Sequence, residues 1–317
     1  MKKCIICNSK KLKPMRVKEM MFGTNETFEY MICNTCGSLG LSEVPKNLED
    51  YYPENYYSFS NSNQNKLISS IKHQKDKHSL GEKNIIGYIF NLIFSEDSNL
   101  KAINYCNKAK SSAEILDIGS GGGVLLKKLC KHGYKKLYGI DPYLEKDKIE
   151  DGVVLRKKKV SDLVKEKRKY DIVILSHVLE HLQNPYKNLS IIINNIRKGG
   201  KLIIRVPISS SKAFEKFHKN WFQIDAPRHL FVPSLKGVYI MANNLNLSCD
   251  YFFFDSTQAQ FKVSHNYIKG IPLIKQINTP LWKRISIKLL FYSLKARRLN
   301  KKSQGDQATF VFSQKHM

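Results

Sequence analysis

A run of glycines between two differently patterned segments constrains this chain more than any other feature. The residues Asp117-Ile-Gly119-Ser-Gly121-Gly-Gly123 end the apolar run EILDIG and precede a helical pattern over 124–132. Glycine adopts left-handed backbone conformations without a Cβ clash, and it allows a ligand to approach the main chain closely. The spacing therefore predicts a sharp strand-to-helix turn that binds a ligand.

The rest of the chain after Ser112 alternates short β-branched runs with helical stretches. This alternation is typical of βαβ units in a mostly parallel sheet. The predicted strands lie at 114–119, 137–141, 153–157, 170–176, 201–206, 247–255 and 308–313, and the predicted helices at 124–132, 185–197 and 234–244. The last two strands are expected to pair antiparallel at one edge. We therefore predict an α/β, Rossmann-like sheet of seven strands.

The spacing of the glycines distinguishes between two kinds of ligand-binding turn. A dinucleotide-binding turn has the pattern G-x-G-x-x-G, with a carboxylate about 20 residues further on. Here the pattern is G-x-G-x-G after Asp117, and Asp141 closes the second strand. This arrangement resembles motif I of the class I methyltransferases, which bind S-adenosylmethionine. The structural alternative is a tight glycine turn with a helix-capping aspartate.

The resemblance implies a role for each residue of the motif. Asp117 would face the positively charged methionine end of the donor, and Asp141 would accept hydrogen bonds from both ribose hydroxyls. The three glycines Gly119, Gly121 and Gly123 would shape the loop around the donor. The sequence thus predicts a donor-binding site in this domain.

Two further segments carry polar side chains that suit a catalytic pocket. Ser176-His177-Val-Leu-Glu180-His181 follows the fourth strand, and Asp225-Ala-Pro-Arg-His229-Leu follows the fifth. Open α/β sheets bind ligands at the carboxyl ends of their strands. Both segments resemble those of the ubiquinone-pathway-like small-molecule methyltransferases. The resemblance implies that Ser176 belongs to the cofactor site and that His177 lines the pocket.

A histidine is also the expected base. We take His229 as the first candidate and His177 as the second, because an imidazole with a pKa near neutrality accepts a hydroxyl proton readily. In the structural alternative, His229 and Arg228 tie their loop to the sheet, and Glu180 stabilises a helix N-terminus. Residues 177–181 also match H-x-x-E-H, the inverted zinc-protease signature. In the proteases this motif lies within a helix and is followed by a third zinc ligand, whereas here it follows a predicted strand, so we do not favour a protease.

Four of the seven cysteines form two C-x-x-C pairs, Cys4 with Cys7 and Cys33 with Cys36. The pairs bracket a stretch that is expected to form a hairpin around Gly23. Four thiolates at this spacing predict a zinc ribbon, and because they leave no coordination position open, the zinc is expected to be structural. A redox role is the weaker alternative.

The chain is expected to divide into three parts. Residues 1–45 form the zinc-ribbon module, and residues 46–110 comprise a tyrosine-rich segment, a linker and a helical lead-in. Residues 111–317 form the methyltransferase domain, with an acceptor-side insertion at about 207–300. The ribbon followed by DYYPENYYSF resembles methyltransferases of bacterial surface-polysaccharide and sugar-modifying pathways. This resemblance implies a sugar-bearing acceptor.

The charge is the last feature that bears on partners. There are 53 Lys and Arg against 27 Asp and Glu, a formal net charge of +26 that attracts acidic acceptors, nucleic acid or anionic lipid. The stretch 280–301 mixes apolar and basic residues, as expected of either a peripheral membrane contact or a core helix. The N-terminus lacks the apolar region of a signal peptide, so we expect a cytoplasmic protein, which could lie at the inner face of the membrane.

These observations lead to one main hypothesis and two rivals. The main hypothesis is O-methylation of a small, nucleotide-linked or lipid-linked sugar with S-adenosylmethionine as donor. Oxygen is preferred because no Asn-Pro-Pro-Tyr-like motif follows the fourth strand, and carbon methylation stays open. The rivals are an RNA methyltransferase that uses the basic surface and the zinc ribbon, and a non-catalytic, zinc-stabilised binding module.

Overall fold

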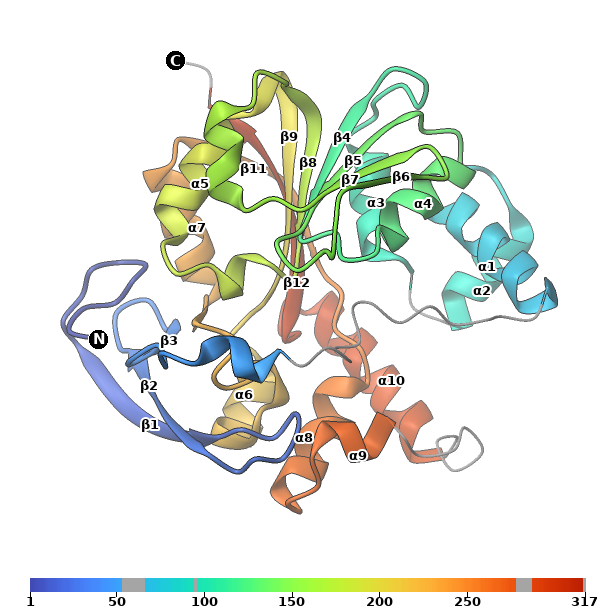
Figure 1. The fold of residues 1–317 in the computed structure, drawn as a ribbon. Helices are drawn as coiled ribbons and strands as arrows, with labels where there is room; N and C mark the ends of the chain where they lie inside the picture. Colours follow the sequence, from blue (N-terminus) through green and yellow to red (C-terminus); the bar gives the residue numbers. More distant parts are fainter. Residues whose placement is uncertain (53–65, 94–95, 278–286, 316–317) are drawn as a thin grey trace.

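The computed structural model describes residues 1–52, 66–93, 96–277 and 287–315. Figure 1 shows a large central sheet with helices on both faces and a small N-terminal sheet beside it. The order of strands in the large sheet is β11-β12-β9-β8-β4-β5-β7-β6. This arrangement confirms the prediction of an α/β, Rossmann-like fold, and the sheet is mixed.

The strands of the large sheet follow the predicted segments closely. In chain order they are β4 (Glu114–Ile118), β5 (Lys136–Ile140), β6 (Lys148–Glu150), β7 (Val153–Arg156), β8 (Tyr170–Ser176), β9 (Ile196–Pro207), β11 (Leu247–Phe254) and β12 (Gln307–Gln314). The strands β9, β8, β4, β5 and β7 are parallel to one another, and β12 runs antiparallel between β9 and β11. The predicted antiparallel pairing of the last two strands is confirmed.

Two predictions about this sheet are wrong. The sheet has eight strands instead of seven, because β6 pairs antiparallel with β7. The connecting residues Asp151 and Gly152 have φ of 51° and 76°, which suits a tight hairpin turn of two residues. The helix predicted over 185–197 ends at Asn194, and β9 begins at Ile196.

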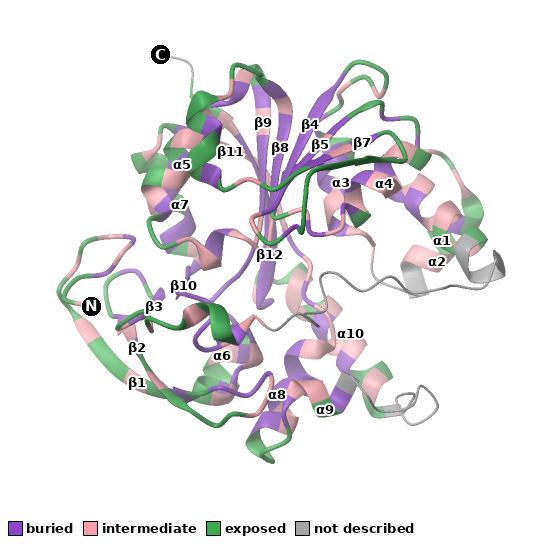
Figure 2. Cartoon of the chain, viewed as in Figure 1, coloured by how far each residue is buried: buried purple, intermediate pink, exposed green. Residues whose placement is uncertain are grey.

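The helices cover both faces of the sheet and thereby bury its central strands. On one face lie α1 (Lys66–Ser79), α2 (Ile85–Ile93), α3 (Ser98–Tyr105) and α4 (Val124–Lys131), and on the other lie α5 (Pro185–Asn194) and α7 (Leu235–Asn244). Figure 2 shows the buried residues gathered in β4, β8 and β9. A parallel strand with both faces covered reads as a continuous apolar run, which is why β8 could be placed from the sequence.

The first 45 residues form the small sheet, ordered β1-β2-β3-β10. Its strands are β1 (Leu12–Lys18), β2 (Thr27–Cys33), β3 (Leu39–Leu41) and β10 (Phe231–Val232). The strands β1 and β2 form the expected hairpin around Gly23. The fourth strand, β10, comes from the predicted acceptor-side insertion and pairs with β3. One sheet therefore contains both the N-terminal module and part of the main domain.

The remaining elements are helices, most of them in the loops and in the predicted acceptor-side insertion. They are η1 (Leu48–Tyr51), η3 (Val160–Lys165), η4 (Leu179–His181), α6 (Lys212–Phe217), η5 (His218–Asn220), η6 (Phe222–Ile224), α8 (Ala259–Ile268), α9 (Leu273–Ile277) and α10 (Ile287–Lys301). Residues 66–79, part of the predicted linker, form α1. No helix in the described ranges is long and apolar enough to span a bilayer.

Two predicted segments lie partly outside the described residues. Of the tyrosine-rich segment, the structure describes Tyr51 and Tyr52 but not 53–60. Of the apolar and basic stretch 280–301, it describes 287–301 as α10. Three side chains there, Leu290, Phe291 and Leu294, are exposed.

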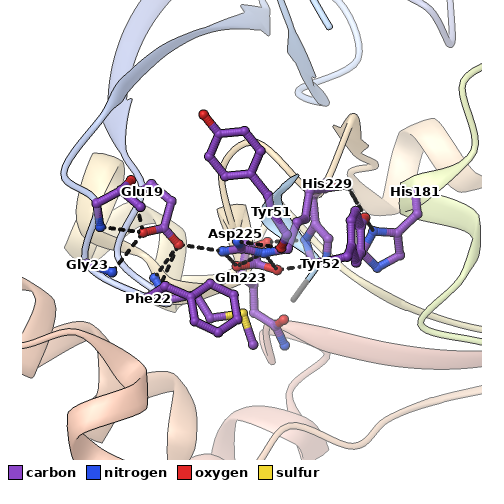
Figure 3. A network of polar contacts seen from close by, with 12 residues as sticks. Glu19, Phe22, Gly23, Tyr51, Tyr52, His181, Gln223, Asp225 and His229 are labelled. Atoms are coloured by element: carbon purple, nitrogen blue, oxygen red, sulfur yellow. Dashed lines mark hydrogen bonds and ion pairs between the residues drawn. The ribbon is translucent and has the colours of Figure 1, made fainter. Parts of the chain in front are cut away.

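A buried ion-pair network joins the small sheet to the main domain (Figure 3). The Arg228 side chain is fully buried, and its Nη2 lies 2.9 Å from Glu19 Oε1 and 2.6 Å from Asp225 Oδ1. Glu19 also accepts hydrogen bonds from the backbone amides of residues 21–24. The Arg228 Nη1 donates to the Tyr51 carbonyl. One guanidinium thus contacts three segments that are far apart in the sequence.

We expect Arg228→Ala to lower the free energy of unfolding by about 3–5 kcal/mol, because it leaves Glu19 and Asp225 as buried charges without a partner. Urea denaturation followed by circular dichroism measures the change. The control is Arg298→Ala, which removes an exposed guanidinium from α10 and should stay within about 0.5 kcal/mol of the wild type. Equal effects of the two substitutions would contradict this role of Arg228.

Candidate functional site

The candidate site lies where the strand order reverses. From β4 the chain moves outward to β5 and β7, and it then returns to form β8 on the other side of β4. In open α/β sheets such a reversal leaves a crevice outside the carboxyl ends of the two central strands. The glycine loop follows β4, and the segment 176–181 follows β8. The structure therefore brings these predicted site residues to one edge of the sheet, with Asp141 at the end of β5.

The glycine loop has the backbone conformation that its sequence predicts. Gly119, Gly121 and Gly123 have φ of 71°, 50° and 76°, all in the region that favours glycine. A Cβ on Gly119 would lie 2.4 Å from Cγ2 of Val178, so the loop also packs against the segment after β8. Gly123 is the N-cap residue of α4, and no side chain caps this helix. The alternative of a capping aspartate is therefore not what the loop shows.

The two predicted acidic residues differ in their hydrogen bonds. Asp141 Oδ2 accepts a hydrogen bond of 2.9 Å from the Gly121 amide, and Oδ1 accepts one of 2.9 Å from the Tyr143 amide. Asp117 is buried at the end of β4, and burial, followed by the negative charge of Asp141, raises the pKa of Asp117 to about 7. No cation among the described residues offsets this effect. Asp117 is thus a buried acid without a partner cation.

The segment after β8 holds a histidine and a glutamate in contact. His177 has φ of 57°, an uncommon conformation for a residue with a Cβ, and its Nδ1 lies 3.2 Å from Glu180 Oε1. Its side chain is 32% exposed, whereas Glu180 is fully buried. Burial acts to raise the pKa of Glu180, but the hydrogen bond from His177 and the charges of nearby histidines outweigh it and lower that pKa to about 2. Ser176, just before them, accepts a hydrogen bond from Asn99.

The third predicted segment places His229 beside Glu180. His229 is 5% exposed, its Nδ1 lies 2.8 Å from the Gln223 carbonyl oxygen, and its Nε2 lies 3.9 Å from Glu180 Oε1. The His181 ring packs edge-on against His229, with centroids 4.7 Å apart. Burial lowers the pKa of His181 to about 4. The two predicted site histidines, His177 and His229, thus lie beside one carboxylate, and of these two His177 is the more exposed.

Two tyrosines connect the two sides of the site. The Tyr52 ring stacks on Tyr143 with centroids 5.5 Å apart, and it meets His181 edge-on at 6.0 Å. The Tyr52 hydroxyl lies 2.9 Å from His181 Nδ1. Sequence reasoning missed Tyr143, although its position two residues after Asp141 is a signal that could have found it. For Glu180, the sequence predicted only the stabilisation of a helix N-terminus.

The four cysteines of the N-terminal module also come together. The Sγ atoms of Cys4 and Cys36 are 3.6 Å apart, and those of Cys7 and Cys33 are 3.5 Å apart. All four are free thiols whose sulfur atoms lie within 4.8 Å of one another. Thiolates around a tetrahedral zinc ion at ~2.3 Å are separated by ~3.8 Å. The cysteines therefore fit a tetrahedral metal ion.

Comparison with known proteins gives one family and several similar structures. Residues 94–250 match a family described as "Methyltransferase domain". A SAM-dependent methyltransferase from Archaeoglobus fulgidus is 18% identical, and the match covers 71% of this chain and 98% of that chain with a TM-score of 0.41. A methyltransferase from Geobacter sulfurreducens in complex with S-adenosyl-L-homocysteine is 13% identical, with coverage of 68% and 90% and a TM-score of 0.41. No curated protein matches the sequence.

The raised pKa of Asp117 predicts how stability depends on pH. Its folded pKa of about 7 lies above the unfolded value of ~3.9, so protonation favours folding. The resulting stability is fully present below pH ~4 and is lost as the pH rises through 7, by about 4 kcal/mol. We expect Asp117→Asn to gain this amount relative to the wild type between pH 4 and pH 8. Urea denaturation of the ligand-free proteins measures it, and a difference that does not change with pH would contradict the assignment.

Proposed function

We propose that the protein methylates a hydroxyl of a sugar-bearing acceptor. The premise is that residues 94–250 are a class I S-adenosylmethionine-dependent methyltransferase domain. The protein is a methyltransferase, and the donor and its chemistry follow from that family. The acceptor, the roles of individual residues and the zinc ion are parts of the proposal. The observation that supports it most is a buried acid without a partner cation beside an open glycine loop.

The residues around the glycine loop fit a cationic donor. S-adenosylmethionine supplies an electrophilic methyl group on a positively charged sulfur when it is bound. Asp117 is buried without a cation among the described residues, so a positively charged ligand would offset its burial. Gly119 is exposed, so its backbone is open to close approach by a ligand. Asp141 accepts hydrogen bonds from the Gly121 and Tyr143 amides, and in this proposal its carboxylate would also accept from the ribose hydroxyls of the donor.

We propose His177 as the residue that takes the hydroxyl proton. Glu180 Oε1 accepts from His177 Nδ1, so the lone pair of the imidazole lies on Nε2, and the side chain is partly exposed at the strand end. The acceptor oxygen would form its bond to the methyl carbon as the carbon–sulfur bond breaks, and its proton would pass to Nε2. His229, the first candidate from the sequence, is nearly inaccessible, so we place it second.

A sugar carried on an acidic group fits the surroundings of this histidine. Tyr52 and Tyr143 form a stacked pair between the glycine loop and His181, and Tyr143 is 55% exposed. An aromatic face packs well against the apolar face of a sugar ring. The net charge of +26 would draw a nucleotide-linked or lipid-linked sugar toward the protein. We place this reaction in the cytoplasm.

The C-terminal helix α10 supports a peripheral membrane contact as part of this proposal. Leu290, Phe291 and Leu294 are exposed, and the helix contains five Lys and Arg residues and no acidic residue. Apolar side chains among basic ones suit the surface of an anionic bilayer. Such a contact would hold the enzyme near a lipid-linked acceptor. The rival of RNA methylation is supported by the same net charge and by the N-terminal cysteine cluster.

We also propose that Cys4, Cys7, Cys33 and Cys36 hold a structural zinc ion. The spacing of their sulfur atoms matches a tetrahedral site, and four thiolates leave no position for a substrate. The Cys36 carbonyl accepts from Ser234, the N-cap residue of α7, so the ion would also stabilise the contact between the small sheet and the main domain. Its function would be to hold β1, β2 and β3 against the acceptor side.

Replacement of one of these four cysteines should lower both the zinc content and the thermal stability of the protein. We expect Cys33→Ser to lose one equivalent of zinc and to unfold at a lower temperature than the wild type, because metal binding contributes to folding free energy. Elemental analysis and calorimetry measure the two effects. Cys130→Ser, which replaces a half-buried thiol outside the cluster, is the control and should keep the zinc. An unchanged zinc content in Cys33→Ser would refute the proposed ligand set.

The test of the proposed function separates donor binding from methyl transfer. Calorimetric titration with S-adenosylhomocysteine should show saturable binding to the wild type, and Asp141→Ala should weaken it at least about tenfold because the glycine loop loses its hydrogen bond. Folded wild type that does not bind would refute the donor site. Nucleotide sugars are then screened as acceptors with radiolabelled donor.

The substitution His177→Gln tests the proposed role of His177 in methyl transfer. It should lower kcat by about 10²–10⁴-fold while S-adenosylhomocysteine binds as before, since proton transfer contributes about that much. His218→Asn is the matched control, because His218 is an exposed histidine that belongs to neither the glycine loop nor the cluster around Glu180. Full activity of His177→Gln would transfer the role of base to His229.

A further inference from the structure

A second group of potential metal ligands lies beside the proposed base. Glu180, His181 and His229 each offer one ligand atom, and these atoms lie within 4.8 Å of one another. Glu180 and His181 belong to η4, directly after β8, whereas His229 comes from the loop before β10. The tertiary fold, not one local motif, thus assembles the three side chains.

The Glu180 carboxylate has one oxygen without a partner. Its side chain is fully buried, Oε1 lies 3.2 Å from His177 Nδ1, and Oε2 has no hydrogen-bond partner among the described residues. A carboxylate oxygen that is buried away from water and accepts no hydrogen bond destabilises the folded protein. Such an atom calls for a ligand, and a cation would satisfy it.

The histidines are held as metal-binding histidines commonly are. A carbonyl oxygen only accepts hydrogen bonds, so the Gln223 carbonyl at 2.8 Å fixes the proton of His229 on Nδ1 and leaves the lone pair on Nε2, which faces Glu180. The His181 ring is oriented by the Arg228 carbonyl and the Tyr52 hydroxyl, each 2.9 Å from Nδ1. A backbone carbonyl on the second nitrogen is the usual support of a histidine ligand.

The charges of the surrounding network also favour a cation. The buried carboxylates Glu19 and Glu180 and the partly buried Asp225 lie in one connected network with one guanidinium, that of Arg228. Asp225 Oδ2 is 4.0 Å from His229 Nε2, so a second carboxylate borders the group. Three acids against one fixed cation leave an excess of negative charge, which a divalent ion would balance.

We propose that Glu180, His181 and His229 bind a divalent transition-metal ion, of which zinc is the best match. Two imidazoles and one carboxylate are a common zinc set, and they suit magnesium or calcium poorly because those ions prefer oxygen ligands. Around a tetrahedral ion the ligand atoms are ~3.3 Å apart, so the side chains close on the ion by roughly 1 Å. Three protein ligands leave a coordination position open.

The open position gives this ion a function distinct from that of the cysteine cluster. An acceptor hydroxyl that coordinates the ion is polarised and loses its proton more readily, which would assist transfer of that proton to His177. This catalytic role rests on the proposed methylation of an oxygen, whereas the binding of the ion does not. In this arrangement His229 uses its lone pair on the metal and is not the base.

Metal content tests the proposal without an acceptor. The protein is loaded with excess zinc chloride, the free ion is removed by gel filtration, and bound zinc is counted by elemental analysis. We expect two equivalents in the wild type and one in Glu180→Gln and in His229→Gln, which keep the cysteine cluster. Cys33→Ser should also retain one equivalent, at the second site, and His218→Asn should retain two.

Cobalt identifies which site each variant loses. Cobalt(II) bound to thiolates gives intense sulfur-to-metal absorption, whereas cobalt bound to nitrogen and oxygen ligands gives weak visible bands alone. Glu180→Gln should keep the intense absorption and lose the second set of bands. A wild type that binds one equivalent, or a second equivalent that survives in both Glu180→Gln and His229→Gln, would overturn the proposal. S-adenosylhomocysteine titration of the same samples reports whether the fold and donor site are intact, so failure of the metal site and failure of the methyltransferase site are distinguishable.

Discussion

The buried guanidinium of Arg228 is the interaction on which the proposed acceptor side of this protein depends. It pairs with Asp225 in its own loop and with Glu19 in the N-terminal module, and it donates to the Tyr51 carbonyl. Its own carbonyl lies 2.9 Å from His181 Nδ1. Removing one partner of a buried ion pair leaves an uncompensated charge, so loss of any one of these contacts would weaken the others. The N-terminal module is therefore part of the site and not an appendage.

The two sides of the crevice are built in different ways. The donor side comes from one continuous segment, 114–181, in which strand ends and a glycine loop follow each other along the chain. The acceptor side collects residues from the small sheet, from the chain around Tyr52 and from the loop before β10. The pairing of β10 with β3 holds these pieces in register. Substitutions in the small sheet would therefore affect the residues around Tyr52 and His229 more than the glycine loop.

This difference explains what the sequence predicted and what it did not. The strands and the glycine loop of the donor side were predicted correctly because local patterns determine them: β8 is one apolar run, and Gly119 needs a left-handed φ. The strand β6 was missed because its residues are exposed and carry no apolar pattern, although Asp151-Gly152 is a hairpin signal. The contact of Glu19 with Arg228 joins residues 209 positions apart, and no local pattern encodes it.

Both sides of the crevice share one electrostatic feature. Asp117 on the donor side is a buried acid without a cation, and Glu180 on the acceptor side has a buried oxygen without a donor. Burial of Asp117 and of the unpartnered Glu180 oxygen each costs free energy, although the contacts with nearby histidines keep Glu180 ionised. A cationic ligand would offset the cost of burying both groups, because a buried carboxylate attracts a nearby positive charge more strongly than an exposed one. The proposed methyl donor and the proposed metal ion are both cations, so each would bring positive charge to one of these two buried acids.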